Sequence, residues 1–251
     1  MIRVPAAAVS LIVLVVFWHF TVVISGISEH VFPSPWLVAQ SFAELLLDGT
    51  LIKHSIASLY RVTTGFYLAV ALGIPLGLII GRTKCIKPII NPLIQFLRPI
   101  SPLAWIPLAM LWFGLGDPPA IFLIFLACFF PLVVTTNAAI DSINPVYFQV
   151  ASNFKFSRYE ALTQVLLPAI MPEIITGLRL TVAIAWLVVV AAEMIAVQSG
   201  LGFLILDSRN ALRMDHVLVG MVMIGLIGML LDYIMQQLAT SESVLWKRSE
   251  Q

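Results

Sequence analysis

The sequence predicts an all-α membrane protein, a transmembrane bundle of about six helices. Of its 251 residues, 60% are hydrophobic and only 11% are charged, and the mean hydropathy is +1.01. Soluble domains carry about 25% charged residues, so a soluble fold could not bury this much apolar surface. Several apolar runs reach the roughly 20 residues needed to cross a hydrocarbon core of about 30 Å. A single transmembrane domain over 1–251 is therefore expected, with its core at 55–240.

Six segments are long and apolar enough to be spans. They are 6–26, 60–81, 93–113, 119–138, 174–197 and 216–238. The first exceeds the 7–15-residue core of a signal peptide, so we expect it to be retained as a helix. Six crossings would place both termini on the same side of the membrane.

Lysine and arginine are distributed unevenly between the two sides. One side holds eight, namely Arg3, Arg82, Lys84, Lys87, Lys155, Arg158, Lys247 and Arg248. The other side holds four, namely Lys53, Arg61, Arg209 and Arg213. Short cytoplasmic loops are enriched in these residues, so the count predicts a multi-pass protein of the cell membrane with both termini in the cytoplasm.

Two connections on the outer side have local structure of their own. After the first span, Pro33 and Pro35 predict a turn, and 36–47 has the amphipathic spacing of a helix lying at the interface. Between the last two spans, Gly200 and Gly202 allow a turn before the polar stretch 207–215. That stretch is either a surface for an external partner or a re-entrant or interfacial helix.

The third span is irregular. It contains or adjoins four prolines, Pro92, Pro99, Pro102 and Pro107, each of which removes a backbone donor and crowds the preceding turn. Broken backbone at membrane depth is tolerated where protein or a water-filled cavity covers it, so the segment is expected to face the bundle interior. Either it contributes to a substrate path, or it is a short kinked helix after an interfacial stretch.

The connection 141–172 is long for a helix-to-helix loop, since most have about 2–8 residues. We expect a helix, a short turn at 155–157, and a second helix that Pro168 and Pro172 interrupt before the fifth span. The turn carries three aromatic side chains, Phe154, Phe156 and Tyr159. Exposed aromatics on a short loop are typical of a protein-docking surface.

At these residues the chain resembles the permease subunits of binding-protein-dependent ABC importers. Their cytoplasmic signature is Glu-Ala-Ala, three residues, Gly, nine residues, Ile, one residue and Leu-Pro. Ala151 fills the third position, nine residues separate Lys155 from Val165, and Leu167-Pro168 closes the motif. The departures are Gln149 for the acid, Val150 for the first alanine and Lys155 for the glycine.

The flanking helices extend this resemblance over nearly the whole chain. "SLYRVTTGFYLAVALGIPLGLIIGR", "LRPISPLAWIPLAMLWFG" and "LRLTVAIAWLVVVAAEMIAVQSGLGFLI" look like the branch that serves sulfonates, taurine, nitrate and bicarbonate. "RPISPLAW" with "AWLVVVAAEM" is most similar to the nitrate and bicarbonate permeases. The resemblance implies a type I importer fold, two membrane subunits forming a homodimer, two ATPase subunits and an external substrate-binding protein. It also implies a coupling loop made of Gln149, Ala151, Phe154, Lys155, Phe156, Tyr159, Leu167 and Pro168.

The sequence is consistent with ATP hydrolysis on another chain. None of the five lysines follows a glycine, so the Gly-x-x-x-x-Gly-Lys phosphate loop is absent from the sequence. ATP and Mg²⁺ would be held by partner subunits, and this chain is not expected to be an enzyme. Cys85 and Cys128 lie too far apart for a metal-ligand spacing, and a net charge of +1 offers no basic face for nucleic acid.

The main alternative is a secondary transporter or a channel subunit that works without an ATPase. Secondary transporters usually have two repeated halves with matched broken helices, and only 93–113 is strongly broken here. An integral membrane enzyme would need a ligand set or a pair of acids that the sequence lacks.

Ionisable residues at membrane depth are costly and indicate function or pairing. We expect Glu193 to pair with an arginine or to orient a loop rather than to bind an anion. Arg98 could meet Glu193 or guard an inner vestibule, and Arg179 could extend to the interface or attract an anion. The candidate translocation path is Arg98, Ser101, Trp105, Arg179, Trp186 and Glu193.

Overall fold

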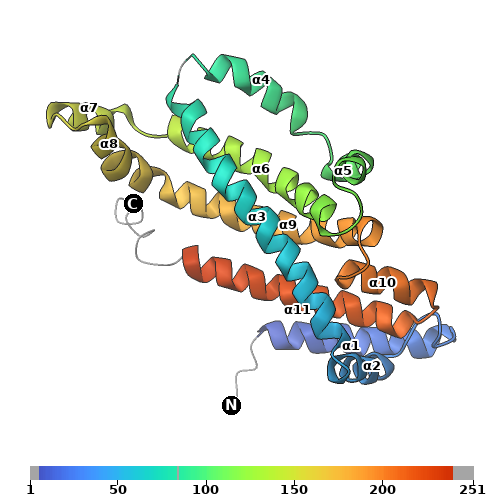
Figure 1. Cartoon of the computed structure of the whole chain (residues 1–251). Coiled ribbons are helices and arrows are strands. Elements are labelled where there is room, and N and C mark those ends of the chain that lie inside the picture. The colour runs from blue at the N-terminus through green and yellow to red at the C-terminus, as the bar shows by residue number, and fades with distance from the viewer. Residues whose placement is uncertain (1–5, 84, 240–251) are drawn as a thin grey trace.

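The computed structural model describes residues 6–83 and 85–239, and the ordered elements in these ranges are all helices (Figure 1). They are α1 (Ala6–Ser25), α2 (Pro35–Leu47), α3 (Thr50–Arg82), α4 (Lys87–Leu97), the 3₁₀ turn η1 (Pro102–Trp105), α5 (Ile106–Phe113), α6 (Asp117–Asp141), α7 (Pro145–Asn153), α8 (Arg158–Glu160), the π-helical η2 (Ala161–Leu166), α9 (Leu167–Ala196), α10 (Leu201–Asn210) and α11 (Met214–Ala239). The predicted all-α class is confirmed.

The centre of the bundle is α6, which packs against α3 on one side and α9 on the other. The α3 and α6 helices approach closely because α3 presents a small residue at every fourth position from Gly65 to Gly77. A Cβ on Gly65 would lie 2.8 Å from the Ile124 side chain, and one on Gly77 would lie 2.6 Å from Thr136. Small residues of this kind let membrane helices pack without intervening side chains. The α10 and α11 helices then cover α9.

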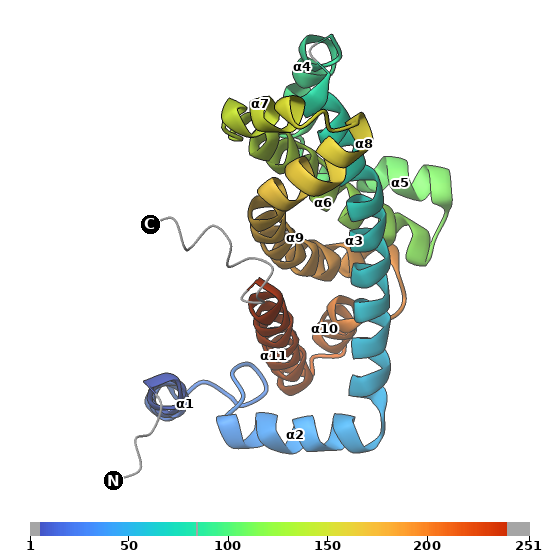
Figure 2. The same cartoon turned by 90° about the vertical axis from the view of Figure 1, so that its left-hand side faces the viewer.

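Four helices in the described ranges are long and apolar enough to cross a membrane: α3, α6, the continuous stretch Arg158–Ala196, and Met214–Leu238. The pair α4 and η1–α5 makes a fifth if it counts as one span, and it is bent by 85°. The predicted first span corresponds to α1, a helix of 20 mainly apolar residues, Ala6–Ser25. The α1 helix lies beside α2, away from α3, α6 and α9 (Figure 2).

Two predicted boundaries are wrong. The second span begins ten residues earlier than predicted, at Thr50, so Arg61 lies inside α3 rather than in an outer loop. Pro168 and Pro172 do not interrupt the helix that leads into the fifth span, because Arg158–Ala196 is continuous. Since proline cannot donate to a carbonyl four residues earlier, the wider π turn of η2 just before Pro168 accommodates the missing bond.

The predicted break in the third span is present between α4 and η1. Only Ile94 of α4 is buried. In α5, Ile106 and Ala109 pack against α6 and the end of α9, while the opposite face of α5 is exposed. The segment is therefore a kinked pair with one face on the bundle.

The predicted interfacial helix is α2, capped by Ser34, whose hydroxyl accepts from the Leu37 N–H. It packs across one end of α11 and leads into α3. The end of the bundle with α2 and α10 is called the α2/α10 end below, and the opposite end with the α7–α8 loop is called the α7/α8 end (Figures 1 and 2).

Candidate functional site

The α7–α8 loop projects from the α7/α8 end, away from the centre of the bundle (Figure 1). The Asn144 side chain caps α7 by accepting from the Val146 N–H at 3.0 Å. Ala151 is 5% exposed and packs inward. Phe154 and Tyr159 are 73% and 74% exposed, so the part of the chain that the structure describes leaves two large aromatic side chains at the tip uncovered.

The turn of this loop has the geometry expected of a glycine. Lys155 adopts φ +55°, the left-handed conformation usually found at the residue after a helix C-cap. The Phe156 N–H donates to the Ala151 carbonyl at 3.0 Å, and the Lys155 N–H donates to the Ser152 carbonyl at 3.0 Å. These two bonds form a Schellman motif. Lys155 therefore adopts, without being a glycine, a backbone conformation that glycine adopts more readily.

On its C-terminal side the loop continues into the bundle as an unbroken helix that packs on α6. Ser157 and Glu160 form a reciprocal capping box, with the Ser157 N–H donating to Glu160 at 2.7 Å. Leu166 is fully buried, and Leu167 packs against the same cluster, which includes Ile140 of α6. The remaining predicted coupling residues, Gln149, Lys155, Phe156 and Pro168, are exposed. A displacement of the tip would therefore act directly on the long helix that continues as α9.

A buried charge network lies toward the α2/α10 end. Arg61 is 2% exposed and Glu193 is 0% exposed, and Arg61 Nη1 lies 2.6 Å from Glu193 Oε1. Arg61 Nε also donates to Asp117 Oδ1 at 2.8 Å, and Nη1 donates to the Ser199 carbonyl at 2.8 Å. The third guanidinium nitrogen, Nη2, donates to the Ser199 hydroxyl. One guanidinium thus connects α3, α6, α9 and the turn before α10.

The other Glu193 oxygen fixes the turn that begins α10. Glu193 Oε2 accepts from the Ser58 hydroxyl at 2.9 Å and from the Gly202 N–H at 3.0 Å. The Ser58 oxygen accepts in turn from the Leu201 N–H at 2.9 Å. Gly200 has φ +102°, and a Cβ there would lie 2.2 Å from Glu193 Oε1, so only glycine fits. Glu193 therefore orients a loop and neutralises an arginine, as expected from the sequence.

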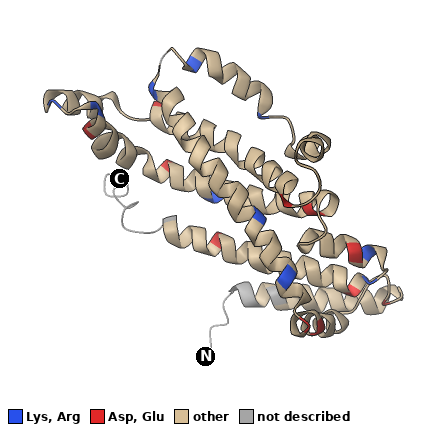
Figure 3. Ribbon diagram, viewed as in Figure 1, with Lys and Arg blue, Asp and Glu red and all other residues tan. Residues whose placement is uncertain are grey.

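The arginine partner differs from the one considered in the sequence. Arg98 is exposed beyond the end of α4 and does not meet Glu193, which pairs with Arg61 instead. Arg179 pairs with Asp232 of α11 at 2.8 Å, and both side chains are about half-exposed. Figure 3 shows that most charged residues otherwise gather near the two ends of the bundle.

The remaining predicted path residues do not form one cluster. Trp186 is 6% exposed, and its indole N–H donates to the Ile224 carbonyl at 3.0 Å, so it packs α9 against α11. Trp105 is half-buried against the α5–α6 cluster, and Ser101 is exposed in the bend before η1. No three His, Cys, Asp or Glu side chains within the described ranges are grouped as metal ligands would be.

Sequence reasoning missed Arg61, Ser58, Asp117 and Ser199. Arg61 was counted with the cations of the outer side, although it lies at the start of the predicted span 60–81. The available signal was the helical spacing of the residues buried in α3, which are Leu51, Ser55, Ser58, Arg61, Val62, Gly65, Ala69, Gly73, Gly77 and Ile80. Four cations of the orientation count, Arg3, Lys84, Lys247 and Arg248, lie outside the described residues.

Comparison with known proteins gives one family. The family described as "binding-protein-dependent transport system inner membrane component" matches residues 73–241. The taurine transport system permease protein of Escherichia coli is 36% identical over 228 residues, covering 89% of this chain and 83% of that protein. The nitrate import permease protein of Synechocystis sp. is 35% identical over 239 residues, covering 92% and 86%.

The fold also matches a solved transporter. The structure titled "Inward facing conformations of the MetNI methionine ABC transporter" superposes with a TM-score of 0.66 at 14% identity. It covers 85% of this chain and 98% of that chain. At this identity the match concerns the fold alone, and it agrees with the type I importer fold that the sequence resembles.

Proposed function

Because the chain belongs to the family of binding-protein-dependent transport system inner membrane components, we propose that it is the permease subunit of an ATP-driven importer for a small anionic solute. The relatives named above are permeases for taurine and for nitrate, both of which carry an oxyanion group. Nitrate or bicarbonate is the favoured solute, followed by taurine and other sulfonates.

The observation that carries the proposal is the projecting α7–α8 loop. Its tip exposes Phe154 and Tyr159, and the turn at Lys155 is fixed by two backbone hydrogen bonds. Large exposed aromatics on a rigid turn are suited to fill a pocket on a partner protein. We assign that partner as an ATPase subunit, because the sequence contains no phosphate loop with which to bind ATP itself.

The proposed mechanism is alternating access. When two ATPase subunits close on nucleotide, they would move the loops of two permease copies. Each loop continues into the stretch Arg158–Ala196, whose far end carries Glu193. The movement would therefore reach the α2/α10 end through one helix and the buried network there. Only an ATPase that binds the two states unequally can shift the equilibrium between them.

The proposed orientation places the α7/α8 end in the cytoplasm and the α2/α10 end outside. The polar stretch 207–215, which forms the end of α10 and the start of α11, would then face an external substrate-binding protein. Arg209 and Arg213 are exposed there, and Arg213 is held by Asp215 at 2.9 Å. The chain would carry no cofactor, with ATP and Mg²⁺ bound by the ATPase subunits.

The test is solute-stimulated ATP hydrolysis and solute uptake by the complex reconstituted in vesicles. The complex contains this chain, its ATPase and its binding protein, and nitrate, bicarbonate and taurine are compared. We expect one of these anions to stimulate hydrolysis and to accumulate inside. Uptake that continues without ATP would favour a secondary transporter or channel, and no stimulation by any anion would count against the importer.

A further inference from the structure

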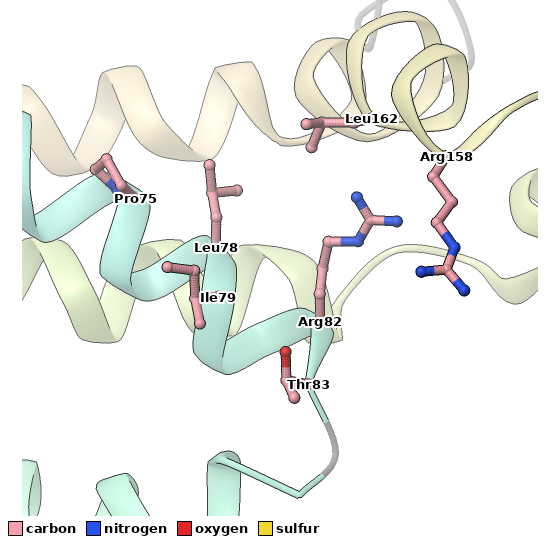
Figure 4. Close-up of a pocket in the computed structure, with 7 residues that line it drawn as sticks. All are labelled: Pro75, Leu78, Ile79, Arg82, Thr83, Arg158 and Leu162. Atoms are coloured by element: carbon pink, nitrogen blue, oxygen red, sulfur yellow. The ribbon is translucent and has the colours of Figure 1, made fainter.

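A hollow of about 570 Å³ lies at the α7/α8 end, between the last turns of α3 and the helix that starts at α8. It is lined by Pro75, Leu78, Ile79, Arg82, Thr83, Arg158 and Leu162. Figure 4 shows the guanidinium groups of Arg82 and Arg158 directed from these two elements into the gap between them. The two arginines are 76 positions apart in the sequence and meet only through the fold.

Both arginines are free to bind an anion. Within the described ranges, neither forms an ion pair with a carboxylate, and no acid lines the hollow. The acids nearby in the chain are already engaged, since Asp141 holds Lys87 at 2.6 Å and Glu160 accepts from the Ser157 N–H at 2.7 Å. Paired guanidinium groups match the oxygens of a phosphate group, because each can donate two parallel hydrogen bonds.

Apart from Thr83, the rest of the wall is apolar and belongs to the part of the hollow nearest the membrane core. Pro75, Leu78, Ile79 and Leu162 form it, and Ile79 is 50% exposed. The stretch 62–81 of α3 has no charged residue and would span about 30 Å as a helix, which is the thickness of the hydrocarbon core. Arg82 directly follows this stretch, which places the two guanidinium groups at the level of the lipid headgroups.

We propose that this hollow binds an anionic phospholipid, with the phosphate on Arg82 and Arg158 and an acyl chain along the apolar wall. A free inorganic anion could use the arginines but not the wall, so the wall favours the lipid. The bound lipid would bridge the end of α3 to the start of the loop helix. The proposal does not depend on which solute the protein carries.

The experiment measures binding of a fluorescent phosphatidylglycerol to the full chain in neutral detergent, with phosphatidylcholine as the comparison lipid. Each basic residue near the membrane surface contributes about fivefold to binding of an anionic lipid. We expect the pair Arg82→Gln and Arg158→Gln to weaken phosphatidylglycerol binding about thirtyfold. The matched control is Lys53→Gln, an exposed cation at the other end of α3, which should leave the affinity unchanged.

Three measurements on the wild-type chain keep the test decisive if the double variant does not fold. Binding of phosphatidylglycerol should fall as salt rises, because the contact is electrostatic. Salt-independent binding, or equal affinity in the wild type and the double variant, would overturn the proposal. Inorganic phosphate that binds as tightly as the lipid would assign the hollow to a free anion instead. If adding the ATPase subunit displaces the lipid, the two arginines would be assigned to carboxylates of that subunit instead of to a lipid.

Discussion

Arg61→Met is expected to lower the free energy of unfolding by about 3–5 kcal/mol, because it leaves the buried Glu193 carboxylate without its cation. Glu193 Oε1 is held by Arg61 at 2.6 Å, whereas Ser58 and Gly202 both donate to Oε2. Oε1 thus loses the only charged donor available to it in the described structure. For a chain of this size the loss corresponds to a fall in Tm of roughly 6–20 °C.

Two further variants separate the charge from the shape of the site. Glu193→Gln should cost about 1–3 kcal/mol, since its single carbonyl oxygen can serve Arg61 or the Ser58 and Gly202 donors but not both. Replacing both Arg61 and Glu193 by Met removes both charges, so it should cost less than the sum of the two single Met variants.

The assay is thermal and chemical unfolding in detergent, followed by tryptophan fluorescence. The control is Arg209→Met, which removes an exposed arginine at the same end of the bundle. The reasoning is refuted if Arg61→Met unfolds like Arg209→Met, or if the Arg61 and Glu193 substitutions are additive.

Three other predictions concern the backbone. Gly200→Ala should destabilise the protein by more than about 1 kcal/mol, because φ at Gly200 is +102° and the new Cβ would meet Glu193. The control is Gly225→Ala, which has open space around the new Cβ and should be neutral or stabilising in the same unfolding assay. Lys155→Gly should keep the loop turn and the uptake rate. Lys155→Val should lower the uptake rate, because a β-branched residue disfavours φ +55°. Wild-type uptake by the valine variant would argue against the turn. Gly77→Leu should separate α3 from α6 and prevent recovery of a monodisperse complex by size-exclusion chromatography, and normal elution and stability would contradict the close packing.

The fold was largely predictable from apolar run length. The spans 119–138 and 216–238 agree with α6 and α11 within a few residues, because each run is apolar on nearly every face. The amphipathic segment 36–47 corresponds to α2, whose apolar side packs on α11. The resemblance to importer permeases, drawn from the loop and the flanking helices, is confirmed by the family match.

Features that depend on a distant partner were not predictable. The start of α3 was predicted too late, because the first turns of this helix carry polar residues. Arg61 can lie inside the helix because Glu193, 132 positions away, neutralises it. Glu193 was correctly assigned to pairing, but the choice of arginine required the packing of α3 on α9. The continuity of the helix through Pro168 depends on the π turn of η2, which has no simple sequence pattern.

The central claim is that the α7–α8 loop couples ATP hydrolysis on a partner to transport through this chain. Its most direct test is the ratio of solute uptake to ATP hydrolysis in reconstituted complexes carrying Phe154→Asp. This variant would bury a charge at the contact with the ATPase, so uptake per ATP should fall at least about tenfold. Leu47→Asp places the same charge at an exposed apolar site at the α2/α10 end and should keep the wild-type ratio. Full coupled transport by Phe154→Asp would contradict the claim.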